Sequence, residues 1–366
     1  MSRWMPILAA ALAVAACAAS PFLDAAKPHR TAEGFRNNYP HPEKAGFWAW
    51  QWERWRLGLP REPAGGWKFV TMQPELAALH DRRRTPGITW IGHATLLLQI
   101  AGVNVLTDPL FSERASPVGF AGPRRVVPPV PALAELPRID LVLISHNHYD
   151  HLDVDSVRGL ARQAGGAPKF LVPLGLKTWF ARQDIDDVEE FDWWERASHA
   201  GLDIHFVPVQ HWSKRTLWDA NQTLWGGWVV RHPQLSFFFA GDTGYSKDFA
   251  DIGAKFGGFD LAAIPIGSYA PRWFMQIMHA DPEESVRIHR DVRARQSVAI
   301  HWGTFANLSD EDLDEPPRRL AQARDSAGLP AQAFFVMKHG ETRRLGRDAQ
   351  AQAADALSAS RGSPSR

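Results

Sequence analysis

Ser145-His-Asn-His-Tyr-Asp-His151 is the stretch that decides the fold of this 366-residue chain. It directly follows the apolar run Ile139-Asp-Leu-Val-Leu-Ile144, which predicts a buried strand. Imidazole nitrogens and carboxylate oxygens suit a divalent cation such as zinc, and crowding them into one turn is costly unless a cation neutralises and orients them. The sequence therefore predicts a metal-binding loop at the end of a strand. The candidate ligands in this loop are His146, His148, Asp150 and His151.

Composition limits the class of protein. With 45% hydrophobic residues the chain can bury a large core. Its 41 Lys and Arg against 40 Asp and Glu give a net charge of +1, so no global positive field attracts a polyanion, and we expect no nucleic-acid partner. The single cysteine excludes both an intramolecular disulfide framework and a cysteine-rich structural zinc site.

That cysteine lies at the end of a predicted secretory signal. Arg3 is followed by an apolar run over 6–16 that is too short to span a bilayer. Val14-Ala-Ala-Cys17 resembles a bacterial lipobox, in which the cysteine becomes the lipidated first residue of the mature protein. We therefore predict a signal peptide with a lipobox cysteine over 1–17. Lipidated Cys17 would hold the protein at a membrane surface in the bacterial cell envelope, as an outer-membrane or periplasm-facing lipoprotein. A signal that is simply cleaved, or an uncleaved anchor, is the alternative.

Residues 18–86 are predicted to form an N-terminal arm with a tryptophan-rich segment. Trp48, Trp50, Trp52 and Trp55 suit either a membrane-interface belt or an arm packed on the domain. We favour packing, because the first three alternate as strand residues do, whereas Trp52 with Trp55 equally fits a helical face. No later segment reaches the ~20 apolar residues of a spanning helix, so we expect a soluble or peripheral mature protein.

Residues 87–345 are predicted to form one hydrolase domain, and the Ala-, Ser- and Gln-rich residues 346–366 a disordered tail. Short β-type runs alternate with helical patterns across this domain, which indicates an α/β fold. The predicted strands are 88–91, 95–100, 103–107, 141–145, 170–172, 204–209, 235–240, 261–264 and 297–300. The predicted helices are 154–164, 174–182, 282–292 and 317–327.

Three more candidate ligands follow predicted strands. His211, Asp242 and His301 each come just after an apolar run, and open α/β sheets build their sites at the carboxyl ends of strands. With the loop, these make seven candidates, which is more than one zinc ion uses. We therefore predict two metal ions.

The predicted division has one group on each ion and a carboxylate between them. His146, His148 and His211 would bind the first ion; Asp150, His151 and His301 would bind the second; Asp242 would bridge the two. A bridging carboxylate would hold the ions ~3.5–4 Å apart, the separation at which two metals share a hydroxide nucleophile. The predicted cofactor is two Zn²⁺ per chain, with iron or manganese as alternatives.

This constellation resembles the metallo-β-lactamase superfamily over about residues 88–341. The resemblance implies a four-layer αββα sandwich with a dinuclear site. Further segments look like the N-acylphosphatidylethanolamine phospholipase D branch and its RomA-like bacterial relatives. Among them are Trp90-Ile-Gly-His-Ala-Thr95, Gly122-Pro-Arg124, Gln210-His-Trp-Ser213, Ala240-Gly-Asp-Thr-Gly-Tyr245, Pro265-Ile-Gly-Ser-Tyr269 and His301-Trp-Gly-Thr-Phe305. For that branch, the implied reaction is cleavage of N-acylphosphatidylethanolamine to phosphatidic acid and an N-acylethanolamine.

A phosphodiester also suits such a site chemically, since two cations offset the charge that develops at phosphorus. Asp150 would orient the hydroxide, and a water or His279 would protonate the leaving alkoxide. The resemblance puts His279 near the substrate, whereas a capped loop histidine is the alternative.

Tyr269, Arg272 and Trp273 are candidates for a lipid headgroup site, with a buried aromatic turn as the alternative. Asp108 is predicted to tie a turn together through backbone hydrogen bonds. His93 is predicted to support the site or the core, and not to act as an eighth ligand.

Other functions use the same ligands. A lactonase or other ester hydrolase would share both metals, and a metal-binding envelope lipoprotein without activity is the non-enzyme alternative. A β-lactamase is disfavoured by the contexts of Tyr245 and Trp302, and a nuclease by the absence of a basic arm. The sequence leaves the oligomeric state open.

Overall fold

The computed structural model describes residues 20–43, 46–60, 62–82 and 85–345. The predicted signal segment with Cys17 and the predicted tail 346–366 lie outside these residues. Within the described part of the chain, no helix is long and apolar enough to cross a bilayer.

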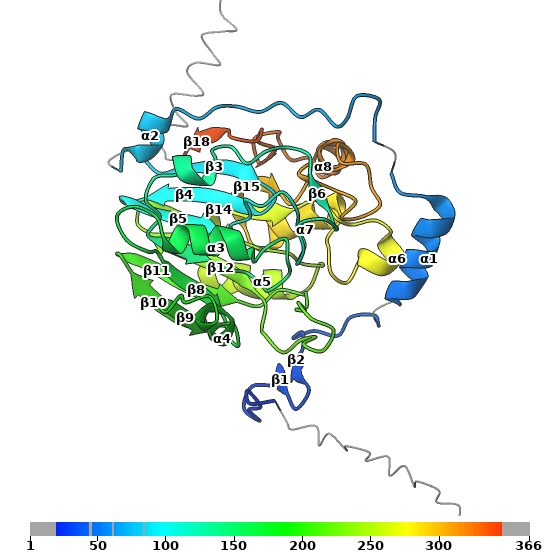
Figure 1. Ribbon diagram of the computed structural model, residues 1–366, viewed down its shortest axis with the longest axis horizontal. Coiled ribbons are helices and arrows are strands. Elements are labelled where there is room, and N and C mark those ends of the chain that lie inside the picture. Colours follow the sequence, from blue (N-terminus) through cyan, green and yellow to red (C-terminus); the bar gives the residue numbers. More distant parts are fainter. Residues whose placement is uncertain (1–19, 44–45, 61, 83–84, 346–366) are drawn as a thin grey trace, which may run out of the picture.

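Two seven-stranded sheets form the centre of the molecule (Figure 1). The first has the order β18-β3-β4-β5-β7-β8-β9, with bounds β3 Gly87–Gly92, β4 Thr95–Ile100, β5 Val103–Thr107, β7 Leu141–Leu143, β8 Lys169–Pro173, β9 Val188–Phe191 and β18 Thr342–Arg344. The second has the order β10-β11-β12-β13-β14-β15-β17, with bounds β10 Arg196–His199, β11 Leu202–Val207, β12 Gly227–His232, β13 Leu235–Phe239, β14 Phe259–Pro265, β15 Ala294–Ile300 and β17 Phe334–Phe335. Two small sheets pair β1 Arg30–Thr31 with β2 Gly34–Phe35, and β6 Arg124–Arg125 with β16 Phe305–Ala306.

Helices cover the outer faces of both sheets. On the first sheet, side chains of α2 Leu76–His80, α3 Val154–Ala161 and α4 Lys177–Ala181 pack into one hydrophobic cluster with the strands. On the second sheet, α5 Asp248–Phe256, α7 Pro282–Asp291 and α8 Glu315–Ser326 contribute to the main core. This arrangement confirms the predicted four-layer αββα sandwich (Figure 1).

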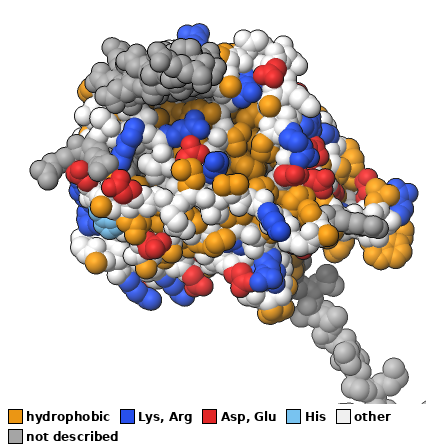
Figure 2. Space-filling view, turned by 90° about the horizontal axis from the view of Figure 1, so that it is seen from above, with side chains coloured by type: hydrophobic (Ala, Val, Ile, Leu, Met, Phe, Trp, Pro, Cys, Tyr) orange, Lys and Arg blue, Asp and Glu red, His pale blue; other side chains and the backbone are white. Residues whose placement is uncertain are grey.

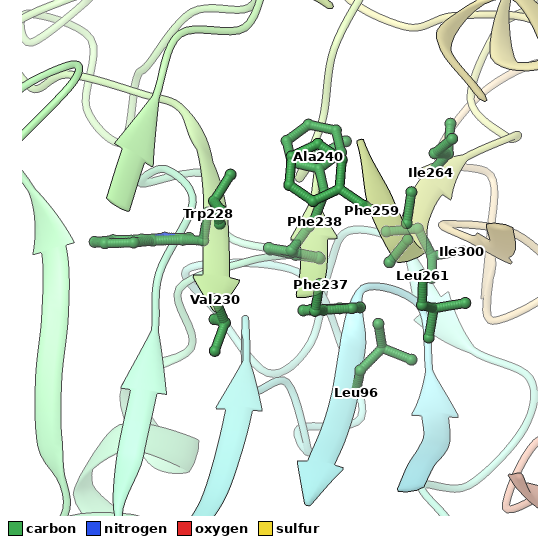
Figure 3. Packing of buried hydrophobic residues seen from close by; sticks show 14 of the residues in the cluster. Leu96, Trp228, Val230, Phe237, Phe238, Ala240, Phe259, Leu261, Ile264 and Ile300 are labelled. Carbon is green, nitrogen blue, oxygen red and sulfur yellow. The ribbon is translucent and has the colours of Figure 1, made fainter. Parts of the chain in front are cut away.

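Burial on both faces explains why the sequences of the central strands are continuous apolar runs. Every residue of β3, β4 and β5 is buried, as expected for a sheet that is covered on both faces. Figure 3 shows how the two sheets meet, with Phe237 of the second sheet beside Leu96 of the first. Strands β4 and β5 have the predicted bounds, because the tight turn at Ala101-Gly102 separates two unbroken apolar runs.

The tryptophan-rich segment is a helix, α1 Phe47–Leu57, so of the two patterns that the sequence left open the helical one is correct. Of its four tryptophans, only Trp50 is buried. It stacks on Phe274 of the short helix α6 Arg272–Met275, with ring centroids 4.7 Å apart. Its indole nitrogen donates a hydrogen bond of 2.6 Å to Asp310. Trp48, Trp52 and Trp55 are 81%, 62% and 74% exposed. Packing on the domain therefore accounts for one tryptophan of the four.

The fold brings the ends of several strands to one edge of the sandwich. The metal-binding loop follows β7 of the first sheet, whereas His211, Asp242 and His301 follow β11, β13 and β15 of the second. Because the two sheets pack face to face, these segments from different sheets converge.

Truncation of Phe237 tests the packing between the sheets. Phe237→Ala should lower the free energy of unfolding by about 3–5 kcal/mol, because it leaves a cavity at a fully buried position. Leu217→Ala, at a side chain that is 77% exposed, should change it by less than about 0.5 kcal/mol. Urea unfolding of both variants checks this, and equal effects would contradict the packing described here.

Candidate metal centre

The first predicted group of ligands is assembled in the structure. His146 Nε2 lies 2.8 Å from His148 Nδ1, which lies 3.2 Å from His211 Nε2. The three nitrogens lie within 4.8 Å of one another, so one cation can contact all three. Three protein ligands with a fourth position open is the arrangement of catalytic zinc sites.

The second group lies beside the first. Asp150 Oδ2 is 3.4 Å from His151 Nε2 and 3.3 Å from His301 Nε2. His93 belongs to the same cluster, since its Nε2 is 3.1 Å from Asp150 Oδ2. The sequence predicted His93 as a supporting residue, and a hydrogen bond to Asp150 is such a role.

Asp242 lies between the two groups. Its Oδ2 is 4.0 Å from both His146 Nε2 and His211 Nε2 in the first group, and 3.0 Å from His151 Nε2 in the second. Its Oδ1 is 3.0 Å from His301 Nε2. The carboxylate therefore faces both groups, as a bridging ligand must.

The donor atoms fit cations. His151 Nε2 and Asp242 Oδ1 are both buried and make no hydrogen bond within the described structure, although ligand atoms of other residues lie close to each. Buried polar atoms without a partner are rare, and here they point toward a common centre. A mixed set of imidazole nitrogens and carboxylate oxygens fits zinc and similar divalent ions.

Neighbouring groups fix the orientation of the ligand rings. Asp108 accepts a hydrogen bond of 2.7 Å from His151 Nδ1 and two more from the backbone and hydroxyl of Ser145, at 2.7 and 2.6 Å. His211 Nδ1 donates to the carbonyl of Met278 at 2.9 Å. A carbonyl only accepts, so Nδ1 of His211 carries the proton and its Nε2 lone pair is free for a metal. Asp108 thus ties the turn as predicted and also aims His151.

The backbone around the site is locally strained. Gly241, directly before Asp242, has a φ of 63°, and a Cβ there would lie 2.6 Å from Cβ of Ser145, so only glycine fits. The non-glycine residues His93 and His301 have φ values of 54° and 61°, in the left-handed region. Such strain persists where the surrounding structure imposes it, most often at functional sites.

Protonation of these groups follows from burial and mutual charge. Burial, with repulsion from neighbouring imidazoles, holds the pKa of His146 well below 6.5, so this ring is neutral. Burial alone would raise the pKa of Asp242, but the charges of His151 and His301 outweigh it and hold the pKa well below 3.8. Burial disfavours charge on His301 too, yet the nearby carboxylates raise its pKa to about 9.

His279 reaches the same centre. Its Nδ1 lies 3.9 Å from Asp242 Oδ2, is buried and makes no hydrogen bond to any residue that the structure describes. Burial lowers the pKa of His279 to about 4, so its imidazole is neutral at pH 7. Arg272 donates a hydrogen bond of 2.7 Å to the His279 carbonyl and pairs with Glu284 at 2.8 Å, which holds the His279 loop in place.

The other two headgroup candidates lie differently. Tyr269 is buried, and its hydroxyl donates to Glu315 at 2.6 Å while Arg319 stacks on its ring, which favours the alternative of a buried aromatic turn. Trp273 is 41% exposed and packs edge-on against Phe274.

Comparison with known proteins identifies the family. The Beta-lactamase superfamily domain matches residues 103–302. The chain belongs to the metallo-β-lactamase superfamily. It is 43% identical over 264 residues to N-acyl-phosphatidylethanolamine-hydrolyzing phospholipase D 1 of Caenorhabditis elegans, a match that spans 69% of this chain and 74% of that protein. The predicted membership of the branch that contains this phospholipase is therefore confirmed.

Two further comparisons support the broader class. The chain is 29% identical over 258 residues to a UPF0173 metal-dependent hydrolase of Methanopyrus kandleri, covering 70% of this chain and 98% of that one. The crystal structure of isothiocyanate hydrolase from Delia radicum gut bacteria shares the fold, with a TM-score of 0.57 at 21% identity over 71% of this chain and 99% of that one. This protein is a metal-dependent hydrolase of the metallo-β-lactamase fold.

Neutralising the central carboxylate tests the two-group arrangement. Asp242→Asn should lose bound metal and activity together, because both groups lose the charge that faces them. Metal content by plasma mass spectrometry checks this, with Asp187→Asn in an exposed ion pair as the control that keeps both ions. One tightly bound ion per chain with unchanged turnover in Asp242→Asn would rule out the dinuclear interpretation.

Metal affinity should rise with pH. Without metal, the raised pKa values of His151 and His301 leave both rings protonated at neutral pH, so a cation must displace protons. Since deprotonation of His301 is half complete near its pKa of about 9, the apparent zinc affinity should increase between about pH 6 and pH 9. Chelator competition across this range measures it. An affinity that is constant or falls with rising pH would contradict these charges.

Proposed function

We propose that this hydrolase is a dinuclear zinc phosphodiesterase of the phospholipase D type. Its substrate would be N-acylphosphatidylethanolamine, cleaved to phosphatidic acid and an N-acylethanolamine. The observation that carries the proposal is the pair of ligand groups facing one shared carboxylate, in a chain that is 43% identical to a phospholipase named for this reaction.

Bound cations would supply Lewis acidity, lowering the pKa of an attacking water and neutralising charge on the phosphate. The residues of the chain provide the rest. Asp150 is held by His93 at 3.1 Å, and without metal the charge and hydrogen bonds of its neighbouring histidines outweigh the effect of burial and keep its pKa well below 3.8. Bound cations, in place of the histidine protons, would keep this carboxylate ionised in the same way. An ionised carboxylate can accept a hydrogen bond from the attacking water and orient it toward phosphorus.

His279 is not suited to donate a proton as an imidazolium, but it can bind the substrate. Its pKa of about 4 leaves the ring neutral at pH 7, which favours water as the source of the proton for the leaving alkoxide. A neutral imidazole still donates one N–H hydrogen bond. Its side chain is 13% exposed, so it can bind a substrate oxygen. His279 would thus hold the phosphodiester, and Arg272 would hold His279.

A membrane surface is the proposed partner. Trp48, Trp52 and Trp55 project from α1 into solvent, and tryptophan is enriched at membrane–water interfaces because its ring is apolar while its N–H is polar. Figure 2 shows hydrophobic side chains gathered at the end of the molecule that carries α1. Lipidation of Cys17 and location in the bacterial cell envelope complete this proposal, since two weak anchors together hold a protein stably at a membrane.

A substrate panel tests the function. The purified protein loaded with zinc should hydrolyse N-acylphosphatidylethanolamine vesicles faster than bis(p-nitrophenyl) phosphate, and a simple lactone least. Products are measured by mass spectrometry, and Asp242→Asn serves as the inactive control. Hydrolysis of the lactone alone would favour the lactonase or ester-hydrolase alternative. Two bound ions without turnover of any substrate would favour the non-catalytic metal-binding lipoprotein.

A further inference from the structure

The N-terminal arm reaches one of the candidate metal ligands. Asn37, which precedes the family-matched residues 103–302, makes both backbone hydrogen bonds of His211 with a single side-chain amide. The amide nitrogen of His211 donates to Asn37 Oδ1 at 3.1 Å, and Asn37 Nδ2 donates to the His211 carbonyl at 3.0 Å. The indole nitrogen of Trp225 also donates to Asn37 Oδ1, at 3.1 Å.

His211 needs such support because it lies outside regular structure. Strand β11 ends at Val207, and beyond it Gln210 forms an isolated bridge with Gly244, so His211 itself lies outside the ladder. Its ring is oriented through Nδ1 by the carbonyl of Met278. With the backbone bonded to Asn37 on both sides, the ring and the main chain of His211 are both fixed.

The arm around Asn37 is itself anchored on the domain. Before it, the buried carboxylate of Asp192 binds Lys27 at 2.5 Å, His29 at 2.7 Å and Arg30 at 2.5 Å. After it, the hydroxyl of Tyr39 donates a hydrogen bond to Asp251 of α5. Asn37 therefore has a defined position from which to hold His211.

We propose that Asn37 is a positioning residue for the first metal group. By fixing the backbone of His211, it keeps Nε2 of that ring aligned with His146 and His148. The arm thus completes the metal centre from outside the family-matched region. Carboxamides are suited to this task, because one oxygen accepts from the His211 amide while the nitrogen donates to the His211 carbonyl. This proposal rests on the metal binding in the proposed function, not on its substrate.

Substitutions of Asn37 can remove one or both of its hydrogen bonds to the backbone of His211. Asn37→Asp has nearly the same shape and keeps the acceptor for His211 and Trp225, but it cannot donate to the His211 carbonyl. Asn37→Ala removes both bonds. Asn38→Ala is the matched control, because the neighbouring side chain bonds to Asp248 and to none of the candidate metal ligands in the described structure.

The experiment measures metal binding without any substrate. Zinc affinity is determined by chelator competition in the full chain, and the absorption spectrum of the cobalt-loaded protein reports ligand geometry. In Asn37→Ala and Asn37→Asp, one of the two ions should bind about 10–100-fold more weakly, as is typical when a residue that orients a metal ligand is removed, and the cobalt spectrum should change. Asn38→Ala should retain both affinities and the spectrum. With any substrate that is turned over, the Asn37 variants should lose kcat while KM changes little.

Specific outcomes would overturn the role of Asn37. Wild-type affinity for both ions and an unchanged cobalt spectrum in Asn37→Asp would overturn this role. If Asn37→Ala does not fold, the conservative variant Asn37→Asp alone tests the proposal. Equally weakened zinc binding in Asn38→Ala would also overturn it, because the effect would then come from packing of the arm in general. Weaker metal binding in the Asn37 variants supports the proposal even if N-acylphosphatidylethanolamine proves not to be the substrate.

Discussion

The carboxylate of Asp242 is the constraint on which this centre depends. It is almost completely buried, and its oxygens lie within 4.0 Å of imidazole nitrogens from both ligand groups. A buried charge without compensation costs several kcal/mol, so the fold must keep cationic partners around it. The two packed sheets do this by ending β7, β13 and β15 at one edge, and Gly241 permits the close approach to Ser145 that the turn into Asp242 requires.

Much of the fold follows from the sequence where apolar runs are unbroken. Strands β4 and β5 are buried on both faces, and their bounds are those that the pattern predicts. The sequence left the form of α1 open, because the spacing of Trp48, Trp50 and Trp52 suits a strand while that of Trp52 and Trp55 suits a helix. The segment forms a helix, with Trp50 as its one buried side chain. Strand β12, which lies between β11 and β13 in the second sheet, and helix α5 were not predicted, because their formation depends on tertiary packing that periodicity does not encode.

The candidate ligands could be predicted because each follows an apolar strand, and strand ends converge in α/β folds. A supporting role was predicted for His93, but the partners of the supporting residues could not be predicted, because these contacts join residues that are far apart in the sequence. Asp108 binds His151 across 43 positions, and Asn37 binds His211 across 174. A side-chain amide in a polar arm carries no local signal of such a role. A place for His279 near the substrate was implied only by the family resemblance, whereas its distance to Asp242 and its low pKa, which burial causes, come from the structure.

The most direct test of this account is anomalous X-ray scattering from crystals of the zinc-loaded protein, with data collected on both sides of the zinc absorption edge. Two anomalous peaks per chain are predicted. One should be bounded by His146, His148 and His211, the other by Asp150, His151 and His301, and the carboxylate of Asp242 should lie between them. A single peak, or two peaks of which one lies away from these residues, would contradict the dinuclear centre.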